Sequence, residues 1–213
     1  MIASPQELWP WLALAGLGLF HGINPAMGWL FAVALGLQRG SRRIVLLALV
    51  PIALGHGAAV TAGLAAVLAL GLVLDHATLM RATAVVLIGW ALWHAVYGHR
   101  QRPRVGMQTG LAGLLLWSFL VASAHGAGLM LVPMLLPICG GAAVTPGVDL
   151  GATLPLAVAA VGVHSLAMLA AIATVSVLVY EWIGVGFLRR GWVNLDQVWV
   201  AALVVCGLVL LVA

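Results

Sequence analysis

Four histidines lie inside the long apolar stretches of this chain: His21, His56, His125 and His164. Ionisable side chains are costly in lipid and are retained there mainly for function, and histidine costs least because its ring can be neutral. With a helical rise of about 1.5 Å per residue, all four fall near the middle of their stretches, so we expect them at one depth. Several imidazoles at one depth predict a site for a transition-metal ion, with Ni, Co, Cu and Zn left undecided.

Methionines follow three of these histidines within a few residues. They are Met27, Met130 and Met168. Met168 follows His164 by four residues and therefore shares its helix face. Thioether sulfur is a ligand for soft ions such as Cu(I), which adds the three methionines to the candidate metal site. Methionine is also a common filler of apolar cores, and this second interpretation stays open.

The first apolar stretch is interrupted by Gly22, Asn24 and Pro25. Proline has no N–H to donate, and a bilayer has no water to satisfy the carbonyl that is freed. Irregular backbone at membrane depth is tolerated only where it is buried in protein or lines a cavity. We therefore expect a transmembrane helix broken at Asn24-Pro25. Gly22, Asn24, Pro25 and the later Gly126 are candidate hinge or substrate-path residues.

The composition indicates an all-α membrane protein. Of 213 residues, 64% are hydrophobic and only 7% are charged, and the apolar runs are long. The formal charge of +4 comes from arginines grouped in short loops, which argues against nucleic-acid binding. The two cysteines, Cys139 and Cys206, form no metal or redox motif and are expected to be buried free thiols. The spans contain no nucleophile–base set and no nucleotide loop, which favours a transporter over an enzyme.

We expect one transmembrane domain, 1–213, with six spans, each needing about 20 apolar residues. The predicted spans are 9–37, 44–74, 79–97, 109–137, 156–180 and 198 to the end. A Gly/Pro-rich loop is predicted at 138–155 and an interfacial segment at 181–197.

The two halves of the chain share a weak internal similarity. His21-Gly22 is matched by His125-Gly126, and His56 by His164, at nearly the same spacing. Each half, about 1–100 and about 106–213, holds three predicted spans. An odd number gives the halves opposite orientations, so we expect a three-plus-three inverted repeat with its site at the bilayer midplane.

Arginine placement predicts the orientation. Eight of the nine arginines follow the first, third and fifth predicted spans, and only Arg81 falls on the other side. Because positive loops stay in the cytoplasm, both termini are expected to be extracytoplasmic. The predicted location is the inner membrane of a bacterium.

Residues 18–60 resemble the first half of the nickel/cobalt-efflux (NicO) branch of the LysE superfamily of small membrane exporters. The similar positions are His21, Gly22, Pro25 and the loop 39–43. The resemblance implies six helices, a three-plus-three inverted repeat and export of small cations or amino acids. The chain departs from the family motif at Ala26-Met27, where the family has a second histidine or an acidic residue. That departure favours a softer ion or a non-metal substrate.

Three classes of function remain open. The leading one is a secondary transporter that exchanges a transition-metal cation for protons, and the resemblance implies that it is an exporter. The second is a transporter of an amino acid or another small organic solute. The third is an intramembrane redox protein that holds a metal or haem. The expected partners are the lipid bilayer and the ion or solute, without nucleic acid, and self-association is left open.

Overall fold

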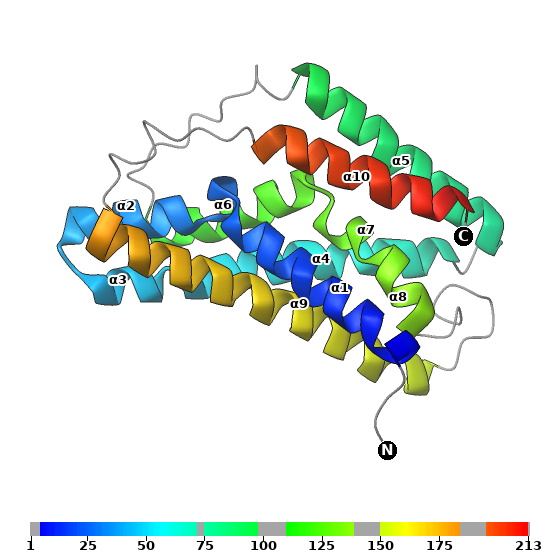
Figure 1. The fold of residues 1–213 in the computed structure, drawn as a ribbon, viewed down its shortest axis with the longest axis horizontal. Helices are drawn as coiled ribbons and strands as arrows, with labels where there is room; N and C mark the ends of the chain where they lie inside the picture. Colours follow the sequence, from blue (N-terminus) through cyan, green and yellow to red (C-terminus); the bar gives the residue numbers. More distant parts are fainter. Residues whose placement is uncertain (1–4, 72–74, 98–109, 139–149, 184–194, 213) are drawn as a thin grey trace.

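The computed structural model describes residues 5–71, 75–97, 110–138, 150–183 and 195–212 (Figure 1). These residues form helices joined by short turns, with no strand among them. The first half holds α1 (Pro5–Ile23), the 3-10 turn η1 (Pro25–Met27), α2 (Trp29–Arg39), α3 (Arg42–Leu47), α4 (Leu49–Gly71) and α5 (His76–Tyr97). The second half holds α6 (Leu111–Ala124), α7 (Ala127–Met130), α8 (Val132–Ile138), α9 (Leu150–Leu178), the π-helical turn η4 (Val179–Ile183) and α10 (Leu195–Val212).

The helices run back and forth along the long axis of the molecule (Figure 1). α1 begins at the side of the molecule where α10 ends. α1 and α2 run from there to the opposite side, where a turn connects α2 to α3. α4 returns, α5 runs back, α6 to α8 return again, and α9 ends beside α2 and α3. Three pairings dominate the packing: α1 lies against α9, α4 against α6, and α5 against α10.

Several helices are long and apolar enough to cross a membrane. Among the described residues these are Arg42–Val67, Ala77–Tyr97 and Thr153–Trp182. Leu111–Ala124 and Ala127–Leu135 would form a fourth span together, although they are bent by 52°. Leu8–Ile23 and Val200–Leu211 are apolar but shorter. The length criterion thus gives three or four spans in this part of the chain, against the six predicted.

The break predicted in the first stretch is present. α1 ends at Ile23, and the Asn24 side chain then accepts a hydrogen bond from the N–H of Ala26 (3.0 Å), which caps η1. Gly28 has φ +123°, a conformation that favours glycine, and α2 begins directly after it. The Trp29 indole N–H donates to the carbonyl of Ile23 (2.8 Å), so one carbonyl that the break exposes is satisfied by a side chain.

Two boundaries differ from the prediction. The span expected at 109–137 is divided into α6, α7 and α8, because Gly126 adopts the left-handed conformation (φ +65°) and ends the α6 ladder just after His125. The loop expected at 138–155 ends earlier, since α9 begins at Leu150. Pro155 lies in the second turn of α9, so it removes one backbone bond near the helix start without ending the helix.

The other predicted connections lie partly outside the described residues. Glu181 and Trp182, at the start of the interfacial segment, extend α9 as η4, and α10 begins at Leu195. The rest of that segment and Cys139 are outside the described part. Cys206 is buried and free within that part.

Glycines set the closest helix contacts. A Cβ on Gly18 would overlap the carbonyl oxygen of His164, and one on Gly22 would overlap that of Met168. α1 therefore packs directly on the α9 backbone. Gly55 of α4 lies against α6 in the same way. Small residues allow this close approach. In lipid the hydrophobic effect does not drive helices together, so close van der Waals packing of this kind stabilises the bundle instead.

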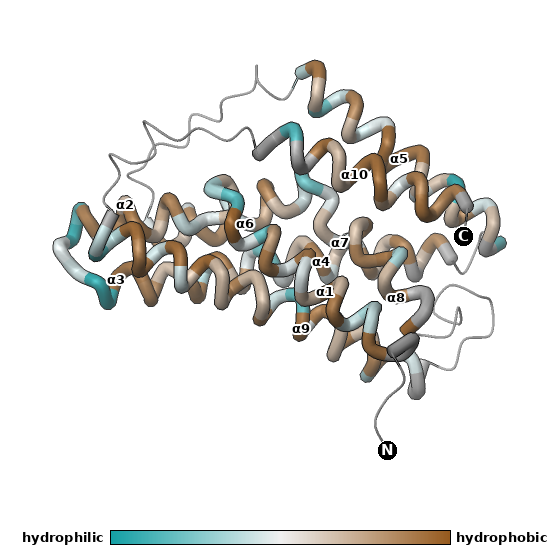
Figure 2. Tube along the Cα trace, viewed as in Figure 1, coloured by the Kyte–Doolittle hydropathy of each residue, from teal (hydrophilic) through white to brown (hydrophobic). Residues whose placement is uncertain are grey.

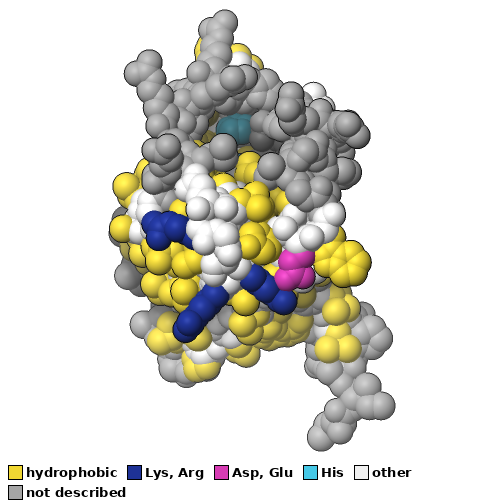
Figure 3. Space-filling model, turned by 90° about the vertical axis from the view of Figure 1, so that its left-hand side faces the viewer, with side chains coloured by type: hydrophobic (Ala, Val, Ile, Leu, Met, Phe, Trp, Pro, Cys, Tyr) yellow, Lys and Arg dark blue, Asp and Glu magenta, His cyan; other side chains and the backbone are white. Residues whose placement is uncertain are grey.

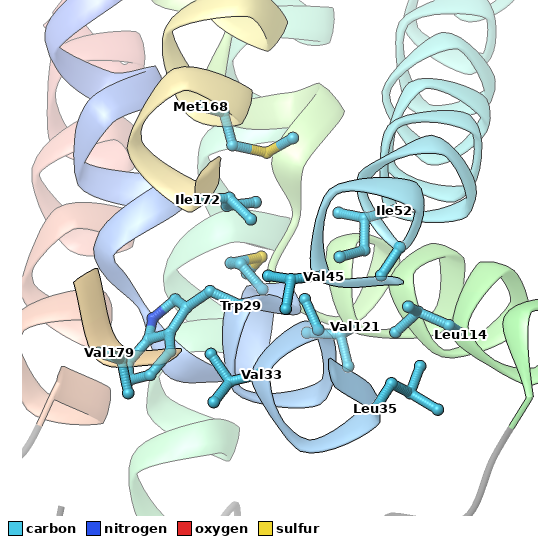
Figure 4. Packing of buried hydrophobic residues seen from close by; sticks show 13 residues of the cluster. Trp29, Val33, Leu35, Val45, Ile52, Leu114, Val121, Met168, Ile172 and Val179 are labelled. Carbon is cyan, nitrogen blue, oxygen red and sulfur yellow. The ribbon is translucent and has the colours of Figure 1, made fainter. Parts of the chain in front are cut away.

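An apolar cluster surrounds α2 at one end of the bundle. Figure 4 shows its side chains pointing toward one another from α2, α3, α4, α6 and α9. Trp29 and Val33 come from α2, Ile52 from α4 and Ile172 from α9, and all four are buried. In Figure 2 brown covers the lengths of the helices, whereas the turn between α2 and α3 is teal. The turn between α2 and α3 is thus a polar end of the molecule.

That turn forms a positively charged end of the molecule. Arg39, Arg42 and Arg43 are exposed there, and Arg42 forms an ion pair with Glu181 of η4 (3.0 Å). Figure 3 shows these side chains on the end face. Arg81 lies near the start of α5, at the other end. The described arginines therefore divide between the two ends as predicted, and the remaining five arginines are outside the described residues.

Asp75 caps α5 at the opposite end from this turn. The backbone N–H of Thr78 donates to its carboxylate (3.0 Å). The side-chain and backbone hydrogen bonds from Thr78 hold the pKa of Asp75 below its usual range. The charged carboxylate therefore favours the helix start by capping it and by complementing its dipole.

Candidate functional site

Three of the four predicted histidines meet at the centre of the bundle, each from a different helix. His21 lies in the last turn of α1, His56 in α4 and His164 in α9. Their ring centroids are 5.0 Å apart for His21 and His164, 5.7 Å for His56 and His164, and 5.8 Å for His21 and His56. We call this set the three-histidine cluster. Its members are 0 to 1% exposed.

The helix contacts explain why the rings meet. Gly18 brings α1 onto the backbone of His164, so the His21 ring, about one turn further along α1, reaches the His164 ring. Gly55 brings α4 onto α6 and leaves the neighbouring His56 turned toward the other two. The Ser118 hydroxyl of α6 donates to the carbonyl of Ile52 (2.9 Å), one turn before His56, and fastens α4 at this depth.

Backbone carbonyls select the tautomer of two of the rings. Nδ1 of His21 lies 3.1 Å from the carbonyl oxygen of Leu17, and Nδ1 of His164 lies 3.4 Å from that of Leu14. A carbonyl oxygen can only accept, so a neutral ring donates from Nδ1 and keeps its lone pair on Nε2. This second bond is the usual way a protein orients a histidine that ligates a metal.

The Nε2 atoms of His56 and His164 are buried and have no hydrogen-bond partner within the described part of the chain. Leaving a buried polar atom unpaired costs about 1 to 3 kcal/mol. Two such atoms in contacting rings are therefore a cost that packing alone does not explain. A ligand that accepts or shares these lone pairs would remove it.

The distances between the three rings suit one shared ion, but the ring nitrogens do not point to a common position. A tetrahedral ion about 2.1 Å from each ring nitrogen would place the centroids of two imidazole ligands about 5 Å apart. The observed 5.0 to 5.8 Å lies close to that separation. Among the described residues, no three His, Cys, Asp or Glu side chains already hold their donor atoms around one metal position. The rings would have to turn to bind.

His125, the fourth predicted histidine, makes its ring contact elsewhere. Its ring faces that of His94 at the end of α5, with centroids 5.7 Å apart. Its Nδ1 lies 2.7 Å from the carbonyl of Val121, so it has the same tautomer as His21 and His164. His125 thus lies beside the cluster without joining its ring contacts.

His94 was given no role by the sequence. The available signal was its spacing from Trp90, one helical turn earlier, which places both on one face of α5. The Trp90 indole N–H donates to the carbonyl of Ala124, immediately before His125. This bond presents that face of α5 to the break between α6 and α7.

The predicted methionines lie in apolar clusters. Met27 and Met168 belong to the cluster around α2, where Met168 is labelled in Figure 4. Met130 belongs to another cluster, between α5 and α10. All three are buried. Their positions are accounted for by packing.

The predicted hinge residues all lie at close contacts or at breaks. Gly22 rests on the backbone of Met168, and Asn24 and Pro25 form the break after α1. Gly126 starts the second break, and both breaks directly follow a turn that carries a buried histidine, His21 or His125.

The charged side chains that the structure describes lie away from the cluster. They are Arg39, Arg42, Arg43, Asp75, Arg81 and Glu181. Each lies in a turn or within the first or last two turns of a helix. The cluster therefore offers neutral nitrogen ligands in apolar surroundings.

Fold and site together define a helical protein with membrane-length apolar helices and a buried cluster of imidazoles at its centre. Comparison with protein-family models, with curated proteins and with solved structures found no match.

Proposed function

We propose that the chain is a secondary transporter of a transition-metal cation, and that the three-histidine cluster is its substrate site. The observation that carries the proposal is the meeting of three buried imidazoles from three helices, with the Nε2 atoms of His56 and His164 unpartnered in the described structure. Neutral imidazole is a good ligand for Zn, Cu, Ni and Co ions.

The absence of nearby charge in the described chain supports a transient site. A cation held by neutral ligands alone, away from water, keeps its full charge in a medium of low dielectric, which is costly. Such a site binds an ion weakly enough to release it, as transport requires. A structural metal site would be expected to include charged ligands such as thiolates.

The same distribution argues against an amino-acid substrate. A zwitterion needs partners for both its ammonium and its carboxylate group. The described charged residues lie at helix ends, away from the cluster. The imidazole nitrogens alone suit a metal cation better.

The packing pattern supports a three-plus-three inverted repeat. In the proposed repeat, α1 corresponds to α6 to α8, α4 to α9, and α5 to α10. Exchanging the halves converts the α1–α9 contact into the α6–α4 contact, and it leaves the α5–α10 contact unchanged. All three main pairings obey this exchange. A site between broken helices of two such repeats is typical of secondary transporters.

We further propose that the protein lies in a bacterial inner membrane with six spans and extracytoplasmic termini. Arg39, Arg42 and Arg43 at one end and the start of α1 at the other support this orientation. The broken first and fourth stretches would each count as one span. Export of the cation is the direction implied by the resemblance of residues 18–60.

The test is metal analysis of the detergent-purified protein. Wild type is dialysed to equilibrium against each of Ni²⁺, Co²⁺, Zn²⁺ and Cu⁺, and its bound metal is measured beside that of the double variant His56→Ala, His164→Ala. His76→Ala, which removes an imidazole at the start of α5, is the matched control. We expect one of these ions to be retained by wild type and by the control and to be lost from the double variant. Equal retention by the double variant would refute the substrate site.

Transport is then measured in vesicles that contain the purified protein. The retained ion should cross the membrane with wild type and with His76→Ala, and the double variant should not move it. Binding without any transport would favour the redox-protein interpretation, and a haem absorption band on purification would establish that class.

A further inference from the structure

We propose that His94 and His125 form a second cation-binding site, the entry pair, which receives the ion from the arginine-bearing side and passes it to the three-histidine cluster. This inference rests on the proposed transport function. It adds a site and a path that the cluster itself does not include.

The geometry of the pair is that of two imidazoles able to share a ligand. Their ring centroids are 5.7 Å apart with an interplanar angle of 54°, a spacing similar to those within the cluster. The bond between Nδ1 of His125 and the Val121 carbonyl leaves the lone pair of His125 on Nε2. A second ring within reach then gives two nitrogen ligands, and water could complete the coordination of an ion that is still partly hydrated.

The backbone holds the pair in place from both sides. On α6, the helix ends at His125 because Gly126 turns into the left-handed conformation, so the ring projects at a helix end. On α5, Trp90 donates to the carbonyl of Ala124 and fixes the face that carries His94. The position of His94 is therefore tied to the same break that carries His125.

Exposure distinguishes the pair from the cluster. His94 is half-buried. The other histidines whose side chains the structure describes, His125 included, are all buried. His94 lies in the last turn of α5, the helix end directed toward the arginine-bearing face (Figure 1). The pair is thus the less enclosed of the two histidine sets, as an entry site requires.

His125 links the pair to the cluster. Its ring contacts that of His94, and His125 ends α6 at the second break as His21 lies in the last turn of α1 before the first break. His21 in turn contacts His56 and His164. The proposed path runs from the half-buried His94 through His125 to His21 and the other two histidines of the cluster.

The experiment compares wild type, His94→Ala, the double variant His56→Ala, His164→Ala, and His76→Ala. Equilibrium dialysis against each of Ni²⁺, Co²⁺, Zn²⁺ and Cu⁺ gives the bound ions per chain, and vesicles give the transport rate. We expect wild type to bind about two ions and His94→Ala about one, at the cluster. The ion concentration for half-maximal transport should rise about tenfold or more in His94→Ala, with His76→Ala unchanged.

The outcomes separate the two proposals. Wild-type binding and transport by His94→Ala would overturn the entry pair and leave the cluster intact. Loss of one ion in His94→Ala, together with unimpaired transport by the double variant, would support the pair as a binding site and refute the cluster as the substrate site. No binding of any ion by wild type would overturn both. If His94→Ala does not fold, His94→Phe makes the same test, because it keeps a ring and removes the nitrogens.

Discussion

Gly18 lies directly against the backbone of His164, so that a Cβ at Gly18 would overlap the carbonyl oxygen of His164. This contact joins α1 to α9 at the depth of the three-histidine cluster. It also allows Nδ1 of His164 to reach the carbonyl of Leu14 on α1. The distance between two of the three candidate ligands is therefore set by a residue that has no side chain.

Gly18→Ala should weaken both the fold and the site. The added methyl meets backbone rather than a flexible side chain, so we expect a loss of about 1 to 3 kcal/mol in unfolding free energy. The matched control is Gly16→Ala, since a Cβ at Gly16 meets nothing within 4 Å. Denaturant unfolding in detergent measures both variants. Equal stability of the two would show that α1 and α9 are not in this close contact.

His164→Asn separates ligation from packing. The amide nitrogen of asparagine can take the place of Nδ1 and donate to Leu14, but nothing replaces Nε2. We expect the unfolding free energy of the metal-free protein to change by no more than about 1 kcal/mol, because one hydrogen bond is kept and the unpartnered Nε2 is exchanged for one unpartnered amide oxygen. Metal binding, measured by dialysis, should be lost. Wild-type affinity in this variant would show that His164 only packs.

Trp29→Phe tests the break after α1. The substitution keeps most of the buried apolar surface and removes the indole N–H that donates to Ile23 (2.8 Å). A carbonyl left without its partner should lower the unfolding free energy by about 1 to 3 kcal/mol. Trp182→Phe is the control, because Trp182 is 81% exposed. Thermal unfolding in detergent should leave the control at the wild-type midpoint, and a similar midpoint for Trp29→Phe would contradict the role of this bond.

The proposed orientation of the protein in the membrane can be tested by labelling two single-cysteine variants. In a background of Cys139→Ala and Cys206→Ala, Ser41→Cys lies in the turn between α2 and α3, and Ala77→Cys lies at the start of α5. A membrane-impermeant thiol reagent added to intact cells should label Ala77→Cys at once. Ser41→Cys should react only after the membrane is opened. Labelling of both from one side would refute the proposed topology.

The sequence alone predicted the features that depend on local chemistry. Membrane-length apolar helices follow from the composition, since few residues could interact with water. The break at Asn24-Pro25 follows from a proline without a donor next to a residue that caps helices. The burial of His21, His56, His125 and His164 follows from their place in the middle of apolar stretches. None of these features requires knowledge of neighbouring helices.

Only the tertiary structure decided which histidines meet. The helices of this chain are apolar on nearly all sides, so the sequence carries little signal of which face turns inward. The rotation of each helix about its axis is set by close contacts such as Gly18 on His164 and Gly55 on Leu115, and these join residues far apart in the chain. As a result His125 faces His94 rather than completing the cluster. Depth is a property of one helix and can be read from its sequence, whereas convergence is a property of the packing between helices.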